Sequence, residues 1–240
     1  MSLSDGEDMR KSDFITGSYY HVYNRGVDHR RLFQSEEDFQ RFYESLYLFN
    51  NEKYQHVNGD PQLRTYLLSG YETLEHERNP FVSILSFCLM PNHYHLFVRQ
   101  NIDEGISKFM HRLGMGYSKY FNQKYERSGS LYEGTFKAIP VQKEPYFSHL
   151  SRYIHLNALD ITDLNWRDKS ISDWGKVIAL LDAYKWSSHH VFEGRGQILP
   201  VVDEEIRNNA FGSVSDYENF LMSWLGMHCL PFDHLYTDSN

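Results

Sequence analysis

The sequence has little of several features that would fix its class at once. It has two cysteines in 240 residues. Cys88 stands in an apolar run, so we expect a buried, reduced thiol and not a disulfide framework. No apolar run is long enough to span a bilayer, and the polar, acidic first residues are unlike a secretion signal. These absences favour a cytoplasmic globular protein with no membrane partner.

Two kinds of catalytic motif are also missing. The sequence has no acidic cluster of the kind that holds two metal ions in many nucleases. It has no glycine-rich loop of the P-loop type that would cradle nucleotide phosphates. The sequence therefore favours a reaction that does not use ATP.

The chain has fewer basic than acidic residues, and the two kinds are distributed unevenly along it. The formal net charge of −8 argues weakly against a nucleic-acid partner. Residues 101–157, however, carry eight Lys or Arg against five Asp or Glu, a local charge of +3, whereas residues 158–240 carry six against thirteen, a charge of −7. A basic region within an acidic chain can still meet a phosphate backbone.

The pattern of apolar residues predicts an α+β fold. We expect strands at 17–26, 81–90, 93–99 and 136–141, and helices at 35–50, from Asn101 onward, and from residue 143 or 144 onward. Ser35 is a plausible N-cap, and Asn101 with Glu104 resembles a capping box. The order β-α-β-β-α-β-α predicts a ferredoxin-like (RNA-recognition-motif-type) antiparallel sheet with helices on one face.

The chain divides into three parts on the same evidence. We expect a disordered or tag-like N-terminus (1–16), a core (17–158) with an insertion at about 51–79, and a helical C-terminal extension (159–240). Helical patterns near 172–184 and 215–225 support the extension. Within the insertion the pattern allows either short strands or a helix.

The most informative motif is a pair of histidines inside a strand. His93 and His95 are two residues apart, so both side chains point to the same face of the sheet. Two imidazoles on a rigid strand can be two ligands of one metal ion. An isolated pair of this kind is more often structural, and His189-His190 is a pair that we expect at the surface.

A second motif lies on the last core helix. Tyr153 and Asn157 are four residues apart and share a helix face. Packed beside the histidines, Asn157 would add an amide oxygen to a divalent cation that grips a phosphate oxygen, and the Tyr153 phenol would attack phosphorus. Each residue alone has an ordinary reading, Asn157 as a helix C-cap and any tyrosine as core packing. The alternative tyrosines are Tyr146, Tyr117, Tyr120 and Tyr125.

Basic residues supply candidates for DNA contact. Lys108, Arg112 and Lys119 fall within about 40° of one another on a helical wheel. Arg127 lies in the basic, glycine-containing loop that follows, and Arg25 ends the first strand. The simpler reading of the stripe is a solvated helix face.

Several segments, in order, resemble one family. Residues 90–96 (MPNHYHL) are similar to the His-hydrophobic-His (HUH) motif of single-tyrosine transposases. Residues 117–122, the loop 127–134, residues 152–157 (RYIHLN) and 186–188 resemble the REP-associated tyrosine transposase branch, as do residues 20–22 and 24–26 of the first strand. The resemblance covers about residues 17–192.

The resemblance implies a function and a site. It implies cleavage and rejoining of single-stranded DNA near hairpins, such as repetitive palindromes, through a 5′-phosphotyrosine link. Tyr153 would be the nucleophile, His93, His95 and Asn157 the metal ligands, and Mg²⁺ or Mn²⁺ the metal. A monomer or a homodimer fits. Two departures are Ala158, where proline is usual, and Tyr132, where tryptophan is common.

Two other functions remain open from the sequence. A DNA-hairpin-binding protein without catalytic activity would keep the fold and cut nothing. A hydrolytic metallonuclease would use water as the nucleophile, and Tyr153 would only pack.

Overall fold

The centre of the molecule is one antiparallel sheet. The computed structural model describes residues 14–53, 61–70, 78–141, 146–162, 164, 166–167, 171, 173–205, 208 and 211–223. Its strands are β1 (Tyr19–Arg25), β2 (Val82–Met90), β3 (His93–Gln100) and β4 (Lys137–Val141). Their order across the sheet is β2-β3-β1-β4. All four predicted strands are therefore confirmed.

Pro91 and Asn92 form the tight turn between β2 and β3. Met90 pairs with His93 across this turn, so the hairpin register is set at the first residue of β3. Every residue of β2 is buried. A strand covered on both faces must be apolar throughout, which explains the continuous apolar run in its sequence.

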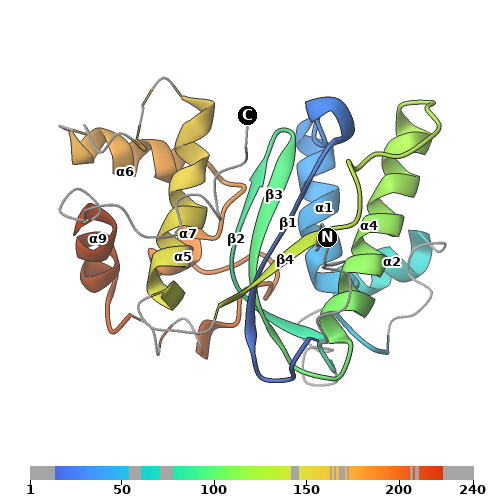
Figure 1. Cartoon of the computed structure of the whole chain (residues 1–240), viewed down its shortest axis with the longest axis horizontal. Coiled ribbons are helices and arrows are strands. Elements are labelled where there is room, and N and C mark those ends of the chain that lie inside the picture. The colour runs from blue at the N-terminus through green and yellow to red at the C-terminus, as the bar shows by residue number, and fades with distance from the viewer. Residues whose placement is uncertain are drawn as a thin grey trace, which may run out of the picture.

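Helices cover both faces of the sheet (Figure 1). The helices α1 (Glu36–Leu48) and α4 (Gly105–Lys124) lie on one side, and α5 (Tyr146–Leu156) lies on the other. The two faces of β3 show this division, because the Tyr94 ring contacts Phe42 of α1 while the His95 ring contacts Tyr153 of α5. The predicted ferredoxin-like class is confirmed, with α1 and α4 as its two helices on one face.

The start of α4 differs from the prediction. The helix begins at Gly105, and the preceding Glu104 has a left-handed backbone with no side-chain cap. Asn101 caps nothing, because its amide contacts the Pro80 carbonyl and the Ser83 hydroxyl instead. The predicted capping box is wrong for this reason: Asn101 belongs to the end of the sheet.

The insertion contains a short helix, α2 (Pro61–Ser69). Arg64 of α2 forms a buried ion pair with Glu44 of α1. This pair attaches the insertion to the face of α1. Residues 1–13, 54–60, 71–77 and 142–145 lie outside the described residues, so the N-terminal prediction and the predicted start of α5 are not tested here.

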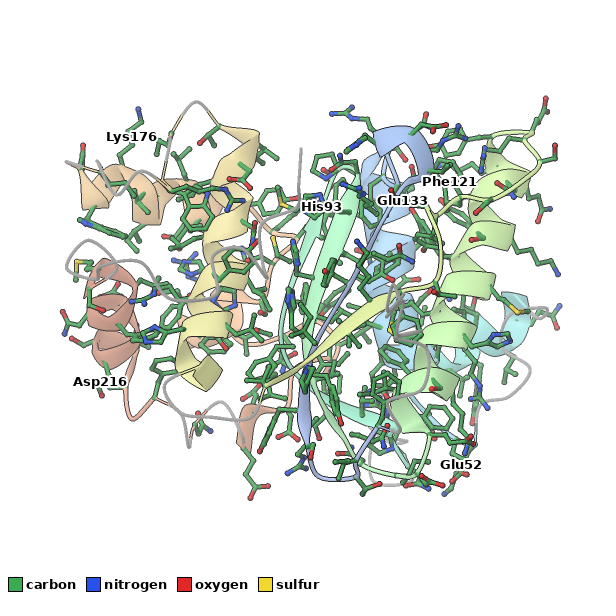
Figure 2. All side chains as sticks on the ribbon, in the orientation of Figure 1. Glu52, His93, Phe121, Glu133, Lys176 and Asp216 are labelled. Atoms are coloured by element: carbon green, nitrogen blue, oxygen red, sulfur yellow. The ribbon has the colours of Figure 1, made fainter. Side chains whose placement is uncertain are left out.

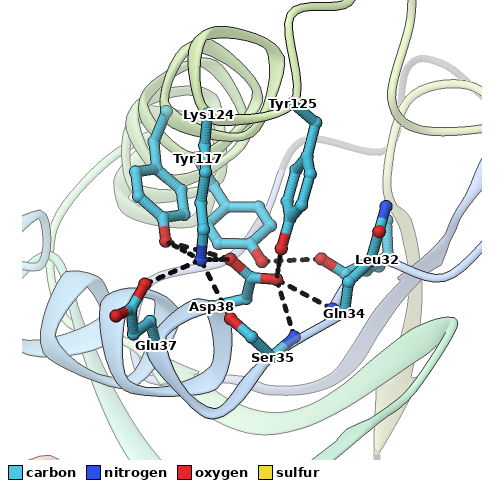
Figure 3. A network of polar contacts seen from close by, with 9 residues as sticks. Leu32, Gln34, Ser35, Glu37, Asp38, Tyr117, Lys124 and Tyr125 are labelled. Atoms are coloured by element: carbon cyan, nitrogen blue, oxygen red, sulfur yellow. Dashed lines mark hydrogen bonds and ion pairs between the residues drawn. The ribbon is translucent and has the colours of Figure 1, made fainter.

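A buried carboxylate joins the two helices that cover the first face (Figure 3). Ser35 and Asp38 form the predicted N-cap of α1 as a capping box. Asp38 is fully buried and also accepts hydrogen bonds from Lys124, Tyr120 and Tyr125. Burial alone raises the pKa of Asp38, but these hydrogen bonds outweigh it and the pKa lies below its usual value.

The C-terminal extension is anchored to the edge of the sheet. It contains α6 (Trp174–Ala183), α7 (His189–Phe192) and α9 (Val214–Met222). Residues 186–188 pair with β2, where Leu89 N donates to the Trp186 carbonyl at 2.9 Å and Ser188 N donates to the Phe87 carbonyl at 2.9 Å. This pairing covers the exposed edge of β2, which would otherwise be open to association with another chain.

A chain of buried polar groups connects the extension to α5. His155 Nε2 contacts Ser188 Oγ at 2.7 Å, and its Nδ1 contacts the Tyr217 hydroxyl at 2.8 Å. The same hydroxyl contacts His189 Nδ1, and His189 Nε2 contacts Asp182. His189 is fully buried, so its predicted surface position is wrong. The backbone hydrogen bond of Ser188 to β2 holds the chain against the sheet, so the next residue, His189, lies in the interior.

None of the described helices is long and apolar enough to cross a membrane.

We expect Asp38→Ala to lower the free energy of unfolding by about 3 kcal/mol, because it leaves a partly buried ammonium and two phenols without their shared acceptor. Urea unfolding measures the change. Glu37→Ala is the matched control, because Glu37 pairs with the same Lys124 at 3.0 Å but its side chain is 81% exposed. Equal losses in the two variants would contradict this account.

Because of its buried histidines, the folded protein should lose stability at acid pH. Burial lowers the pKa of His189 to about 4 and places that of His155 well below its usual value. The unfolded chain then binds more protons than the folded chain below pH 6.5. Stability should be level above pH 6.5 and should fall toward pH 4, by about 1.4 kcal/mol per pH unit for each such group. In urea titrations, His189→Gln should reduce that slope, and an unchanged slope would contradict the prediction.

Candidate active site

Two histidines of β3 face the layer that contains α5. The rings of His93 and His95 have centroids 5.0 Å apart and are nearly perpendicular. The Nε2 atoms of both are buried. His93 is the first residue of β3, and Figure 2 shows it at the same end of the sheet as Glu133. The predicted pair therefore shares one face, as strand alternation requires.

Each histidine is oriented through Nδ1. His93 Nδ1 lies 2.7 Å from Asn92 Oδ1, and His95 Nδ1 lies 2.9 Å from His21 Nε2. An amide oxygen only accepts, so His93 Nδ1 carries the hydrogen and Nε2 presents a lone pair. His95 Nε2 likewise presents a lone pair if His95 Nδ1 donates to His21. A metal ion would thus be held through Nε2 of both residues, with the partners of Nδ1 fixing the ring orientation.

His21 is a residue of this site that sequence reasoning missed. It is fully buried on β1, and its ring stacks on that of His95 with centroids 5.1 Å apart. Two signals together could have found it. The alternation Tyr19, His21, Tyr23 puts three rings on one face, and a ferredoxin-like sheet places the first strand beside the histidine strand.

Tyr153 reaches the same face from α5. Its ring meets that of His95 edge-on, with centroids 5.7 Å apart at 80°, and meets His21 at 6.3 Å. Its ring also lies near that of Trp166, with centroids 6.0 Å apart. Tyr153 is 6% exposed, so a phosphate must approach through a narrow opening or after a small displacement of its neighbours.

The alternative tyrosines of α4 lie on the other side of the sheet. The Tyr117 hydroxyl donates to the Leu32 carbonyl, and Tyr120 and Tyr125 donate to Asp38. The side chain of Tyr146 lies outside the described residues. A tyrosine that sequence reasoning did not consider, Tyr23 of β1, does share the site face, with its ring 5.9 Å from His95.

Asn157 follows the last turn of α5 and begins the 3₁₀ helix η4 (Asn157–Ile161). It is fully buried. Its Nδ2 donates to the Tyr153 carbonyl at 2.8 Å, and its Oδ1 accepts from Arg167 at 3.1 Å. The amide thus caps the end of α5 and fixes Tyr153 to Asn157, while its oxygen is bonded to an arginine.

The surroundings of His95 and His21 disfavour the protonated form of their imidazole rings. Burial is the largest cause that holds the pKa of His95 well below its usual value, and His93, His21 and Arg167 add to it. Burial also lowers the pKa of His21 to about 3. Both rings are therefore neutral at physiological pH, which is the form that binds metal ions.

The predicted DNA-contacting residues are spread over other surfaces. Lys108, Arg112 and Lys119 are on α4, which the sheet separates from Tyr153 (Figure 1). Arg112 donates to the Asn51 carbonyl at 2.8 Å and lies over the Phe81 ring, so it has a structural contact as well. Lys119 is exposed.

The other two candidates are Arg127, in the loop that follows α4, and Arg25, at the end of β1. Arg127 donates to Asn122 Oδ1 of α4 and to the Ser130 carbonyl of its own loop. Arg25 pairs with Glu133 and stands opposite His93 in the strand register. Arg25 therefore lies beside one of the histidines, whereas the α4 stripe lies on the other side of the sheet (Figure 1).

Part of the chain that forms this site is similar to a known family. Residues 52–157 match the family described as "Transposase IS200 like", and the match includes His93, His95, Tyr153 and Asn157. The similarity to IS200-like transposases is confined to this segment, which is less than half of the chain. A search of curated proteins found no relative that matches significantly.

Two solved structures are similar to this chain at low identity. One, a REP-associated tyrosine transposase bound to a REP hairpin, is 12% identical with a TM-score of 0.46, covering 80% of this chain and 87% of that one. The other is a tRNA(His) guanylyltransferase from Saccharomyces cerevisiae, 9% identical with a TM-score of 0.31, covering 92% and 83%. His21, Arg25 and Arg167 lie outside the segment that the family matches.

The donor set of this candidate site suits a divalent cation that keeps open positions. Within the described residues no group of three or more His, Cys, Asp or Glu could hold a metal ion. His93 and His95 would supply two nitrogens, and the remaining ligands would be oxygens from Asn157, water or the substrate phosphate. A site with few protein ligands is typical of a metal ion that must also bind a phosphate.

We expect His21→Ala to weaken Mn²⁺ binding about tenfold, because His95 loses the partner that orients its ring. Calorimetric titration of the protein without DNA measures the affinity. His21→Gln offers an acceptor oxygen at a similar reach and should recover part of the loss. His111→Ala, an exposed histidine of α4, is the control. A folded His21→Ala protein with unchanged affinity would refute the role.

Proposed function

We propose that this protein cleaves and rejoins single-stranded DNA beside hairpins through a covalent 5′-phosphotyrosine intermediate, with Tyr153 as nucleophile. The observation that carries the proposal is the edge-on contact of the Tyr153 ring with His95, at 5.7 Å between centroids, on the face of the sheet opposite α1 and α4. A phenol beside neutral imidazoles is the arrangement that this chemistry needs.

The proposed reaction conserves the phosphodiester. The phenolic oxygen of Tyr153 attacks phosphorus, the bond from phosphorus to the 3′ oxygen breaks, and the leaving oxygen takes up a proton as a 3′-hydroxyl. The phenol proton passes to solvent or to a base of the site. Attack of another 3′-hydroxyl on the phosphotyrosine reverses these steps, so strands are rejoined without ATP.

His93 and His95 would hold the metal ion, Mg²⁺ or Mn²⁺, with Asn157 as a third ligand. When bound, the ion would polarise the scissile phosphate. The support is the pair of buried Nε2 atoms and the bonded Nδ1 atoms, which suit ligand imidazoles. Asn157 is one turn from Tyr153, so binding of its oxygen would also position the nucleophile.

The family match supports DNA as the substrate class. IS200-like transposases act on DNA, and the similar transposase structure is described as bound to a REP hairpin. We assign Arg25 to DNA contacts near the histidines, Arg127 to contacts at the loop after α4, and Lys108, Arg112 and Lys119 to contacts along α4. Because Tyr153 and His95 of one chain are in contact, either a monomer or a homodimer can carry a complete site within one chain.

We expect Tyr153→Phe to abolish a covalent adduct with a 3′-labelled single-stranded hairpin oligonucleotide in the presence of Mn²⁺, because the phenyl ring lacks the attacking oxygen. Denaturing gel electrophoresis detects the adduct. Tyr23→Phe is the matched control, because it removes the other phenol on this face and should leave the adduct in place.

The remaining outcomes identify the other functions. A free 5′-phosphate product with no attached protein would indicate a hydrolytic metallonuclease. Hairpin binding without cleavage under any divalent ion would indicate a binding protein. An adduct that persists in Tyr153→Phe would remove Tyr153 from its proposed role.

A further inference from the structure

Arg167 is the cation nearest to the proposed nucleophile among the contacts of the described residues. Its guanidinium lies 5.8 Å from the centroid of the Tyr153 ring and 4.4 Å from that of Trp166. It also forms an ion pair with Asp160. Neither the histidine motif nor the family match includes it, because it follows η4 at a position beyond residue 157.

The contact between Arg167 and Asn157 conflicts with a ligand role for Asn157. Arg167 Nη2 donates to Asn157 Oδ1 at 3.1 Å. A metal ion bound to the same oxygen would lie a few ångströms from the guanidinium, and two cations at such a distance in a buried site repel each other strongly. Arg167 and the metal ion therefore compete for one amide oxygen.

Arg167 is exposed to solvent, whereas Asn157 is not. The Arg167 side chain is 38% exposed and that of its partner Asp160 is 30% exposed, whereas Asn157 is fully buried and fixed through Nδ2 to the Tyr153 carbonyl. An exposed guanidinium beside the attacking phenol is well placed to bind a phosphate oxygen in a bidentate manner.

We infer that Arg167 couples DNA binding to metal binding: it holds the Asn157 oxygen in the absence of substrate, and transfers to the scissile phosphate when DNA enters, which releases Asn157 to the metal ion. This inference rests on the proposed function and adds a residue that contacts the substrate. DNA and the metal ion should each strengthen the binding of the other. Bound DNA draws Arg167 away from the Asn157 oxygen, and a metal ion on that oxygen leaves Arg167 available to the phosphate.

The alternative is that Arg167 only stabilises η4 through Asn157 and Asp160. The two readings predict opposite effects on metal affinity. If Arg167 competes with the metal ion, its removal frees an oxygen and deletes a positive charge, so affinity for the ion rises. If Arg167 is only structural, its removal loosens Asn157, and affinity falls or stays the same.

The experiment measures Mn²⁺ affinity of the full chain by electron paramagnetic resonance of the free ion, without DNA and with a hairpin oligonucleotide. In the wild type, DNA should increase the affinity severalfold. Without DNA, Arg167→Ala should bind Mn²⁺ about three- to tenfold more tightly than the wild type, and added DNA should increase its affinity little further. Its rate of adduct formation should fall tenfold or more.

Arg195→Ala is the matched control, because Arg195 is another partly exposed arginine of the extension that pairs with an aspartate, Asp182, at 2.7 Å. It should behave as the wild type. Weaker or unchanged Mn²⁺ binding by Arg167→Ala overturns the inference even where the wild type forms the adduct. A wild type that binds Mn²⁺ with the predicted dependence on Arg167, but forms no adduct, overturns the proposed strand transfer and leaves the coupling intact.

Discussion

The site depends on the alternation of side chains along β3. The strand is an inner strand of the sheet, paired with β2 and β1 and covered on both faces. Tyr94 must therefore enter the apolar layer under α1, and His93 and His95 must enter the layer under α5. A shift of one residue in the register would exchange these layers, so the apolar packing of Tyr94 also fixes the histidines.

The two helical layers have different tasks as a result. The layer of α1 and α4 is held by apolar contacts and by the Asp38 network, in which one buried carboxylate collects the polar groups of both helices. The layer of α5 is held through the C-terminal extension, by the buried chain from Ser188 through His155 and Tyr217. The extension thus fixes the helix that presents Tyr153, although it lies outside the matched family segment.

Polar groups at the site orient the functional side chains rather than stabilise the fold. His21 and Asn92 hold the Nδ1 atoms of the two histidines, and Asn157 joins the end of α5 to Arg167. Burial of several neutral imidazoles costs stability at acid pH. Such a cost is typical of a site in which geometry is needed for chemistry.

The sequence by itself determined the order of the strands and helices, the face shared by His93 and His95, the helix with Tyr153, and the Ser35 N-cap. Each depends on a local period or a local hydrogen bond. It misplaced the start of α4 and the burial of His189, because both follow from contacts of Asn101 and Ser188 with distant strands. Only the tertiary structure decided that His21 orients His95, that the tyrosines of α4 lie on the wrong face, and that Arg167 bonds Asn157. These pairs are separated by many residues or by irregular chain, and no periodicity in a sequence specifies which side chains meet across such a distance.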